Sequence, residues 1–509
     1  MPLSSGERRP ANAERRELMA SARPNGWRNP DPVETYDLLV VGGGPAGLAA
    51  AKAAIGRGAK VALIERRLLG GVSLLTGSVP SKSIVRTSRL YADMRNAERF
   101  GVEAPSGIEA NFAAAMERLR RLQARISKYH SADRLRLAGI DLYFGAAQFA
   151  GLDSIVVEGA TLSFRKALIA TGAVGRRPVG IPGLELSGYY TSEDVFDLTE
   201  CPRRLLMIGG GPLGCELAQA FSRLGAHVVI AQNDAQFLPE EERDAAQLLS
   251  ESLARDGVEI HLNSTVVAVR TTMTGEKLVD LVSDDNRTTI AVDHIAVGVG
   301  RIPNVAGLGL EEAGVACDPT SGIRVDDFLR TTNRKIYAAG DVCLARKFTH
   351  AAEASGRLAV ANALFDGKTR WSSLTIPWCT YTDPEIAHVG LYVSEARERS
   401  IPVKTVTVLM HDTDRAMIDG EEEGFVKIHL REGADEILGA TIVASHAGEM
   451  INEITLAIAA RIGLSTLATV IHSYPTQASA IKAAADAFAK TLAEPSAARD
   501  ICRPEWPTG

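Results

Sequence analysis

The chain has few cysteines, and none of them forms a close pair. Its 509 residues include only six, of which Cys201 and Cys215 are the nearest two in sequence. A zinc site or a local redox dithiol normally shows as a Cys-x-x-Cys or similar motif, so the sequence excludes both as local motifs. We therefore predict reduced cysteines, as is usual in a cytoplasmic protein, and no metal site.

Long apolar runs and an excess of basic charge are also missing. No apolar stretch approaches the roughly 18 residues of a spanning helix, and the net charge of −6 provides no basic field for nucleic acid or anionic lipid. The first thirty residues are rich in arginine but include Glu7, Glu14 and Glu17 and no apolar core, so we expect no secretory signal. An amphipathic targeting peptide is left open, although the acidic residues count against it. The sequence thus predicts a cytoplasmic protein with no membrane span and no nucleic-acid partner.

A strand–loop–helix–strand pattern occurs twice in the chain. The apolar run Tyr36–Val41 leads into a glycine-rich loop at 42–47, an alanine-rich helix through Arg57, and a second strand that ends at Glu65. The same order returns with a strand at 204–208, a glycine loop at 209–214, a helix to Leu224 and a strand at 227–230. Glycines between a strand and a helix let the backbone approach a pyrophosphate at the helix N-terminus. The repeat indicates two βαβ nucleotide-binding units in an α/β chain.

The two units differ at the residue expected to read the ribose. Glu65 ends the second strand of the first unit, where a carboxylate accepts hydrogen bonds from a ribose diol. The corresponding residue of the second unit is Gln232, and the turn after it contains Asp234 and no cation. Selective NADPH binding normally recruits an arginine to the 2′-phosphate. We therefore expect a modest preference for NADH, with NADPH left open.

Two further regions have distinct compositions. The stretch 112–137 is helical in pattern and rich in cations; it could form a partner-binding face, but we interpret it as a solvated helix surface. From about residue 375 the chain turns to strands punctuated by proline and glycine, followed by alanine-rich helices at 447–462 and 479–492. This order predicts a third domain of the α+β type.

A series of ordered motifs gives the chain a resemblance to the pyridine nucleotide–disulfide oxidoreductases, a family that includes mercuric reductase, dihydrolipoamide dehydrogenase, glutathione reductase and soluble transhydrogenase. The resemblance extends from about Trp27 to Leu492 and is closest to mercuric reductase-like members. Besides the two glycine loops, the motifs are Gly70-Gly71 leading to Val79-Pro80-Ser81-Lys82, Ala170-Thr171-Gly172, Gly300-Arg301-Ile302-Pro303-Asn304, Ala338-Ala339-Gly340-Asp341, Tyr381-Thr382-Asp383-Pro384-Glu385 and Tyr474-Pro475-Thr476.

The resemblance implies an α/β fold with two Rossmann-like dinucleotide-binding domains, for FAD and NAD(P), and a C-terminal α+β dimerisation domain in a homodimer. We accordingly expect the FAD-binding domain in two parts, at 35–176 and 304–374, around an NAD(P)-binding domain at 177–303. The other expected segments are a polar N-terminal extension at 1–34, an interface domain at 375–495 and a C-terminal tail at 496–509.

The resemblance also implies roles for single residues. Asp341 would bond the FAD ribityl chain, and the helix beginning near Thr349 would point its N-terminus at the flavin. Lys82 would pair with Glu216 beside the reactive flavin nitrogen. The residues expected to bind the cofactors are Gly42, Gly44, Pro45, Ala46, Gly47, Glu65, Arg66, Gly71, Val72, Ser73, Ser78, Lys82, Ala147, Ala170, Thr171, Gly172, Gly209, Gly211, Gly214, Glu216, Gln232, Gly300, Arg301, Gly340, Asp341, Thr349 and His350.

The chain departs from the family at the redox centre. The family segment reads Gly-Gly-x-Cys-x-x-x-x-Cys-x-Pro-Ser-Lys, and here Ser73 and Ser78 stand at the two cysteine positions. A hydroxyl group forms no disulfide, and its pKa is too high for it to replace a thiolate. Tyr474 and Ser479 likewise stand where many members have a His and a Glu, and His472 lies on the same side as Tyr474 if the segment is extended. The expected catalytic residues are Lys82, Glu216, Tyr474 and His472.

These features predict an FAD-dependent NAD(P)H oxidoreductase that is not a disulfide reductase. Hydride would pass from NAD(P)H through FAD directly to a small acceptor, such as a quinone, a metal ion, a dye or another pyridine nucleotide. The alternative is a non-catalytic FAD-binding protein that acts in binding or interaction. The presence of Lys82, Glu216 and the complete second glycine loop favours the enzyme, because a scaffold has no need of groups poised for charge chemistry.

Overall fold

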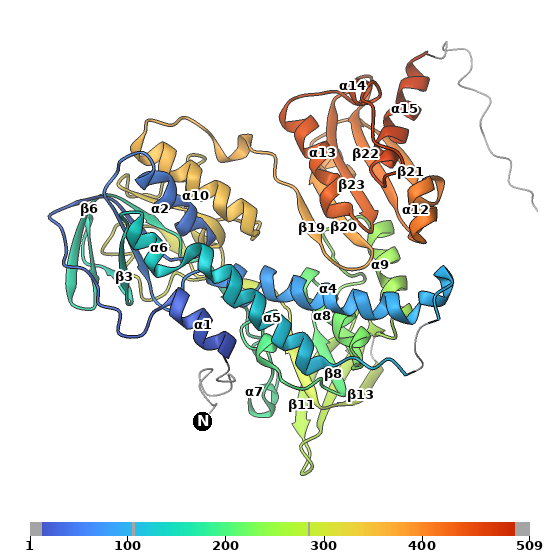
Figure 1. The fold of residues 1–509 in the computed structure, drawn as a ribbon, viewed down its shortest axis with the longest axis horizontal. Coiled ribbons are helices and arrows are strands. Elements are labelled where there is room, and N and C mark those ends of the chain that lie inside the picture. Colours follow the sequence, from blue (N-terminus) through green and yellow to red (C-terminus); the bar gives the residue numbers. More distant parts are fainter. Residues whose placement is uncertain (1–12, 104–106, 284–285, 494–509) are drawn as a thin grey trace, which may run out of the picture. The chain divides into compact units, whose positions relative to one another are not determined.

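The computed structural model describes residues 13–103, 107–283 and 286–493 (Figure 1). The chain divides into two compact units. The first comprises the residues up to 239 together with 253–374, and the second comprises 240–252 and the residues from 375 onward. Both glycine loops belong to the first unit. Within the described ranges, no helix has the length and apolar character needed to cross a membrane.

The first glycine loop follows the central strand of a largely parallel sheet. That strand, β1 (Tyr36–Val41), is buried at every residue except Asp37, as expected for a strand inside a parallel sheet. Helix α2 (Pro45–Ile55) leaves the loop, and α10 (Thr349–Leu364) packs against α2. The strands lie in the order β3 (Asp141–Phe144), β2 (Val61–Glu65), β1 (Tyr36–Val41), β6 (Ala160–Ile169), β5 (Ser154–Val157) and β4 (Ala147–Phe149), with β18 (Ile336–Ala338) also beside β6.

The second glycine loop has an equivalent setting. It connects β8 to α8 (Pro212–Arg223). The parallel sheet around it has the order β10 (Glu259–His261), β9 (His227–Ala231), β8 (Arg204–Ile208) and β14 (His294–Val297). The antiparallel strands β11 (Thr265–Thr271), β12 (Lys277–Ser283) and β13 (Asn286–Val292) share its apolar core. Smaller elements of this unit are β7 (Ala173–Gly175), paired with β15 (Arg301–Pro303), β16 (Cys317–Asp318), paired with β17 (Gly322–Ile323), and α7 (Leu184–Ser187).

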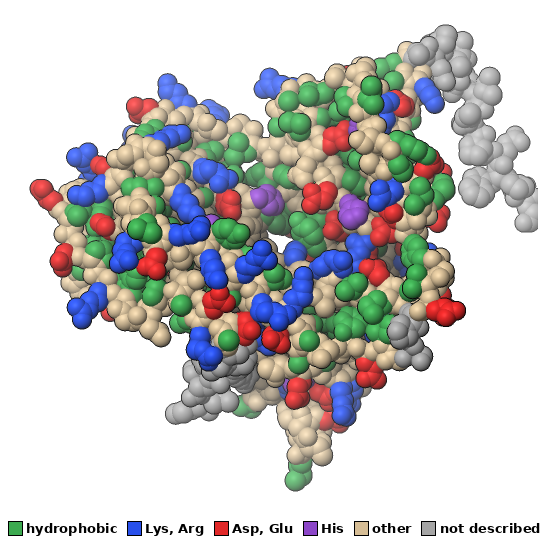
Figure 2. All heavy atoms as spheres, viewed as in Figure 1, with side chains coloured by type: hydrophobic (Ala, Val, Ile, Leu, Met, Phe, Trp, Pro, Cys, Tyr) green, Lys and Arg blue, Asp and Glu red, His purple; other side chains and the backbone are tan. Residues whose placement is uncertain are grey.

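The charged stretch 112–137 is neither one helix nor wholly a solvated surface. It forms α5 (Phe112–Ser127) and α6 (Ala132–Leu137), because Ser131 is extended and its hydroxyl caps α6 by accepting from the Arg134 amide. One face of α5 packs against α4 (Ser78–Arg95), where Arg118 donates to the Ser83 hydroxyl at 3.1 Å. Over α5 the exposed Lys and Arg side chains are mixed with Asp and Glu (Figure 2). The interpretation as a solvated surface is therefore wrong for Arg118.

The N-terminal extension begins the described part of the chain with a folded helix. α1 (Ala13–Ala22) buries Leu18 and Ala22. It lies beside α5 (Figure 1). The rest of the extension runs along β3 to β1. Residues 1–12 of the expected extension and the expected tail at 496–509 lie outside the described residues.

The second unit combines an antiparallel sheet with helices, as the sequence predicts. All eight residues of its strand β23 are buried. The strand order is β19 (Trp378–Thr380), β20 (Glu385–Gly390), β23 (Ile437–Ala444), β22 (Phe425–Arg431) and β21 (Val403–Leu409). Its main helices are α13 (Ala447–Ala459) and α15 (Ser479–Ala493), with shorter ones at α11 (Val393–Glu398), α12 (Asp414–Asp419) and α14 (Leu464–Leu467). Most of α9 (Arg243–Arg255) belongs to it as well.

Candidate functional site

The first glycine loop combines glycines that the fold requires with one, Gly44, that it does not. A Cβ on Gly42 would lie 2.3 Å from the Ala170 carbonyl oxygen, and one on Gly47 would lie 1.8 Å from the Gly42 oxygen. A Cβ on Gly44, the residue at the N-cap of α2, would meet no heavy atom nearer than the Gly71 Cα at 3.7 Å. Packing therefore leaves room beside the backbone at Gly44, at a helix N-terminus. This arrangement fits a pyrophosphate group.

Glu65 borders the same loop at the end of β2. Its Oε2 accepts from the Gly43 amide at 2.7 Å, and its Oε1 accepts from the Arg67 amide at 2.6 Å. Burial raises the pKa of Glu65, and the two amides oppose that rise. Each carboxylate oxygen has a second lone pair that can accept from a ligand hydroxyl. The residue is therefore fixed in the position expected of a ribose acceptor.

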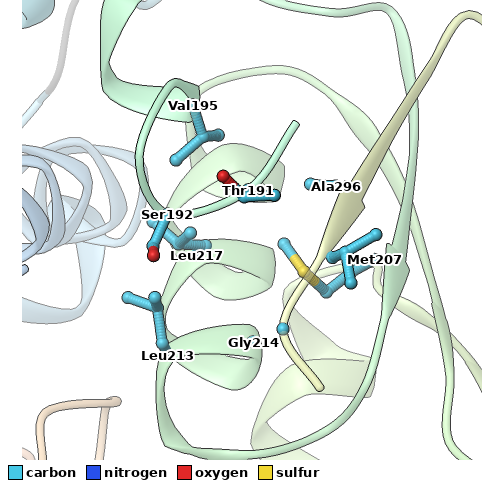
Figure 3. A pocket seen from close by; sticks show the side chains of 10 residues that line it. Thr191, Ser192, Val195, Met207, Leu213, Gly214, Leu217 and Ala296 are labelled. Carbon is cyan, nitrogen blue, oxygen red and sulfur yellow. The ribbon is translucent and has the colours of Figure 1, made fainter. Parts of the chain in front are cut away.

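The second glycine loop repeats the pattern of the first. A Cβ added to Gly209 would lie 2.7 Å from the Gly298 carbonyl oxygen, and one added to Gly214 would lie 2.1 Å from the Gly209 carbonyl oxygen. A Cβ added to Gly211 would have its nearest neighbour 3.8 Å away. A small hollow lies beside this loop at the start of α8 (Figure 3). It is lined by Thr191, Ser192, Val195, Met207, Leu213, Gly214, Leu217, Ala296, Val297 and Gly298.

Gln232 borders the second loop as Glu65 borders the first. Its amide oxygen accepts from the Gly210 amide at 2.7 Å. Its amide nitrogen donates to the Asp234 carboxylate at 2.6 Å. The side chain of Gln232 is almost fully buried, whereas Asp234 is exposed. The residue that borders this loop is thus neutral, and the negative charge lies on Asp234 in the following turn.

Lys82 and Glu216 meet, although they come from separate motifs. Lys82 lies in the first turns of α4 and Glu216 lies in α8. The ammonium nitrogen is 2.9 and 2.8 Å from the two carboxylate oxygens. Glu216 is buried, with 2% of its side chain exposed, and Lys82 is partly exposed at 36%. One end of this ion pair is therefore open to a ligand or to solvent.

Ser73, Ser78 and Thr349 form a chain of hydroxyl groups. Ser73 lies in the short helix α3 (Gly71–Leu75), Ser78 begins α4, and Thr349 begins α10. Thr349 Oγ1 lies 3.1 Å from Ser73 Oγ and 3.2 Å from Ser78 Oγ. Hydrogen bonds through Thr349 therefore connect the two serines to the N-terminus of α10.

Asp341 is paired with Arg301, a contact that the sequence did not predict. The Arg301 Nη1 donates to the Asp341 Oδ2 at 2.6 Å. Burial raises the pKa of Asp341, and the positive charge of Arg301 opposes the rise. Within the described ranges, the Asp341 Oδ1 has no hydrogen-bond partner. One oxygen of a largely buried carboxylate is thus available to a ligand hydroxyl, as expected of a residue beside a ribityl chain.

The other predicted cofactor-binding residues lie at the ends of strands and helices of the first unit. Gly172 and Gly300 have positive φ angles of 70° and 97°, which favour glycine, and adding a Cβ to either meets no atom within 4 Å. Pro45 and Ala46 begin α2, Gly71 and Val72 begin α3, Ala147 begins β4, Ala170 and Thr171 follow β6, Gly340 precedes Asp341, His350 follows Thr349, and Arg66 is exposed after Glu65.

Two residues outside the predicted set join this region. The Thr171 hydroxyl donates to the Asn304 carbonyl at 2.8 Å, and the Asn304 amide donates to the Thr171 carbonyl at 2.9 Å. The position of Asn304 in the motif at 300–304 was a signal for it. Arg23 donates to the carbonyl oxygen of Arg66 at 3.0 Å, and no motif marks this arginine.

The predicted residues Tyr474 and His472 belong to the second unit, where each is paired with a carboxylate. The exposed Tyr474 hydroxyl donates to Asp414 at 2.8 Å, which raises the pKa of Tyr474. The His472 Nε2 lies 2.8 Å from the Glu453 carboxylate, and its Nδ1 lies 3.3 Å from a backbone carbonyl oxygen. Both ring nitrogens face oxygens that only accept, and a neutral imidazole can donate to one of the two at a time.

Comparison with known proteins gives consistent matches over most of the chain. Residues 36–356 match the family described as pyridine nucleotide-disulphide oxidoreductase, and residues 376–485 match its dimerisation domain. The chain is 32% identical to the mercuric reductase of Lysinibacillus sphaericus over 90% of this chain and 84% of that protein. It is 33% identical to the dihydrolipoyl dehydrogenase of Thermus scotoductus, over 90% and 98%. The crystal structure of LpdA from Mycobacterium tuberculosis superposes with a TM-score of 0.81 at 29% identity, over 90% of this chain and 100% of that one.

Proposed function

The chain belongs to the pyridine nucleotide-disulphide oxidoreductases, a family of FAD-dependent enzymes that use NAD(P)H, and from this premise we propose that it passes hydride to a small acceptor that is not a disulfide. The acceptor classes we propose are a quinone, a metal ion, a dye or another pyridine nucleotide. The observation that carries the proposal is the pair Ser73 and Ser78. We assign them to the two cysteine positions of the family motif, and both lie within hydrogen-bond distance of Thr349.

No second thiol pair takes over the role of those cysteines in the described part of the chain. The five cysteines found there are all free. Cys215 and Cys343 are neighbours of predicted site residues, but burial raises the pKa of each thiol and keeps it protonated. A protonated single thiol neither attacks a disulfide nor stores two electrons. We therefore propose that electrons leave the site without a dithiol.

The proposed cofactor site has a clear division of roles among the chain's own groups. FAD, when bound, supplies the group that accepts and releases hydride. Glu216 holds the Lys82 ammonium group through both carboxylate oxygens, which keeps a positive charge at a fixed place in the site. The N-terminus of α10 adds a second source of positive potential. Preorganised positive charge of this kind stabilises negative charge as it develops during reduction.

The preference for NADH follows from the contacts of Gln232. Its amide oxygen is used by the glycine loop, and its amide nitrogen holds the Asp234 carboxylate in the adjoining turn. A 2′-phosphate brought to this turn would meet that negative charge, and the turn from 232 to 236 provides no cation to offset it. We therefore propose NADH as the better substrate and NADPH as a weaker one.

A homodimer is part of the proposal. The match of residues 376–485 to a dimerisation domain supports it, and so do the exposed apolar side chains of Leu456, Val470 and Ile471 in the same unit. Tyr474, which is 76% exposed, would then reach toward the partner's flavin. Light scattering that gives a stable monomer at micromolar concentration would contradict this part.

An anaerobic titration with NADH tests the main proposal. The flavin absorbance should bleach without a long-wavelength band of the kind produced by a thiolate beside oxidised flavin. The double variant Ser73→Cys, Ser78→Cys is the matched control, and it should acquire such a band. A panel of acceptors should then show turnover with quinones or dyes and none with lipoamide or glutathione disulfide.

Three results would decide against the proposal. A thiolate band in the unmodified protein, or disulfide turnover in a preparation free of other reductases, would show that a dithiol is present after all. Absence of bleaching by NADH would instead identify a non-catalytic FAD-binding protein.

A further inference from the structure

The segment 13–29 lies before the part of the chain that matches the family, which begins at residue 36, yet it is built into the first unit. On α1, Leu18 and Ala22 are 7% and 1% exposed, because they pack toward α5. Glu17 forms an ion pair with Lys128 at the end of α5. Apolar burial and an ion pair thus dock α1 on the fold.

Beyond α1, the segment closes the open edge of the first sheet. The side-chain amide of Asn29 donates to the Phe144 carbonyl at 3.0 Å and accepts from the Phe144 amide at 2.8 Å. Trp27 donates to the Leu142 carbonyl at 3.3 Å, and its ring packs edge-on against Phe144. Phe144 and Leu142 belong to the edge strand β3, whose free backbone groups need such partners.

Between these two anchors, the segment holds loop 66–71, which leads from Glu65 to Gly71. The Arg23 Nη1 donates to the carbonyl oxygens of Arg66 and Arg67 at 3.0 and 3.4 Å. The Leu69 amide donates to the Ala22 carbonyl at 3.2 Å. The guanidinium group of Arg23 also lies 5.2 Å from the Phe144 ring centroid. Arg23 is therefore fixed by the sheet edge while it binds the loop.

Loop 66–71 in turn contacts both the ribose acceptor Glu65 and the first glycine loop of the proposed FAD site. The Gly70 amide donates to the Gly43 carbonyl at 2.8 Å, and the Arg67 amide donates to Glu65. A Cβ added to Gly71 would lie 2.7 Å from the Gly44 Cα, so the two loops are in close contact. Any displacement of loop 66–71 would consequently disturb the ribose acceptor and the pyrophosphate cradle together.

We propose that segment 13–29 is a clamp on the FAD site, which holds loop 66–71 against the first glycine loop, and that Arg23 is its positioning residue for the adenosine diphosphate half of FAD. The inference rests on the FAD site proposed above. It assigns a binding role to a part of the chain that lies outside the family match.

The test compares Arg23→Met with Arg28→Met, which alters an exposed arginine of the same segment. The rate at which FAD leaves the diluted holoenzyme is followed by the rise in flavin fluorescence. Arg23→Met should release FAD about tenfold faster, because it removes charge-assisted hydrogen bonds to the loop. Arg23→Lys should restore part of the retention, and Arg28→Met should behave as the unmodified protein.

Two further measurements separate positioning from general stability. The KM for NADH, which reports on the second nucleotide unit, and the thermal midpoint of the protein stripped of FAD should not change in Arg23→Met. An unchanged rate of FAD release, or a KM for NADH that rises in parallel with it, would overturn the inference. The proposed FAD site itself fails separately, if a bulky residue at Gly44 leaves FAD binding normal.

Discussion

Gly44 and Gly211 occupy equivalent places in the two nucleotide-binding units. Each lies at the N-cap of the helix after the central strand, and a Cβ on either would meet no heavy atom within 3.7 Å. The glycines on both sides of them are required by packing, since an added Cβ would lie 2.7 Å or less from a backbone oxygen at each of Gly42, Gly47, Gly209 and Gly214. The cradle geometry is therefore a property of the loop and is the same in both units.

The residue at the end of the second strand is where the units differ. Glu65 satisfies two backbone amides with its own two oxygens. Gln232 satisfies one amide with its oxygen and needs an acceptor for its nitrogen, which Asp234 supplies. The same backbone cradle can therefore be combined with different residues at the ribose position. The condition is that the turn after the strand completes the hydrogen bonds of that side chain.

Bulky substitutions at the two equivalent glycines should have the largest effects, and on different cofactors. Gly44→Leu places a side chain in the space proposed for the FAD pyrophosphate, so FAD affinity should fall at least about a hundredfold. Gly211→Leu should leave the protein yellow but slow flavin reduction by NADH to a similar extent. Each variant serves as the control for the other. Equal loss of both cofactors in either variant would show that the units are not independent sites.

Lys82→Met should have the next largest effect, because the Lys82–Glu216 pair joins helix α4 to helix α8 of the second nucleotide-binding unit. Removing a fixed charge from the site should slow flavin reduction by NADH about tenfold or more in stopped-flow measurements. Lys60→Met, at an exposed lysine, is the control. If Lys82→Met reduces the flavin at the normal rate, the pair has only a structural role.

Much of the structure of the two nucleotide-binding units could be predicted from the sequence, because the patterns that indicate it are local. The glycine spacing and the apolar runs before it predicted the strands Tyr36–Val41 and Arg204–Ile208 correctly. The positions of Lys82 and Glu216 within two motifs predicted that these side chains meet. The folded extension was not predictable in this way. Arg23 and Asn29 bind backbone carbonyls more than forty positions away, and such contacts leave no periodic pattern in a polar segment.

Other contacts were missed for related reasons. The bond between Arg301 and Asp341 joins two motifs that lie 40 residues apart, and each motif was expected to contact the cofactors independently. The helix break at Ser131 depends on a single capping hydroxyl within a continuous helical composition. Local composition predicts that a helix forms, and a single capping residue decides where α6 begins.

Asp234→Asn should shift the nucleotide preference by a smaller amount. The change keeps an acceptor for the Gln232 amide but removes the negative charge from the turn. One exposed charge at contact distance is worth about 1 kcal/mol, so kcat/KM for NADPH should rise about fivefold relative to NADH. Asn233→Ala, at the exposed neighbouring residue, should leave the ratio unchanged. No change in the ratio for Asp234→Asn would place the 2′-position of the ribose elsewhere.

The smallest expected effect is a difference in pH dependence, because Glu65 titrates and Gln232 does not. Burial raises the pKa of Glu65, so in the folded protein it takes up a proton at a higher pH than an ordinary glutamate. As the pH falls through this raised pKa, Glu65 loses its charge and one acceptor, and FAD release should accelerate about threefold. The release of NADH should show no comparable acceleration, because Gln232 has no group that takes up a proton in this pH range.

Glu65→Gln sharpens this last test. The amide of a glutamine at 65 would satisfy Gly43 with its oxygen but would turn its nitrogen toward the Arg67 amide, and two donors do not bond. In the second nucleotide-binding unit Asp234 removes that conflict for Gln232. The variant should therefore release FAD faster than the unmodified protein at every pH, yet without the acceleration toward acid. If the acceleration persists in Glu65→Gln, another group causes it, and the two units then differ in their hydrogen bonding but not in a titration that affects cofactor binding.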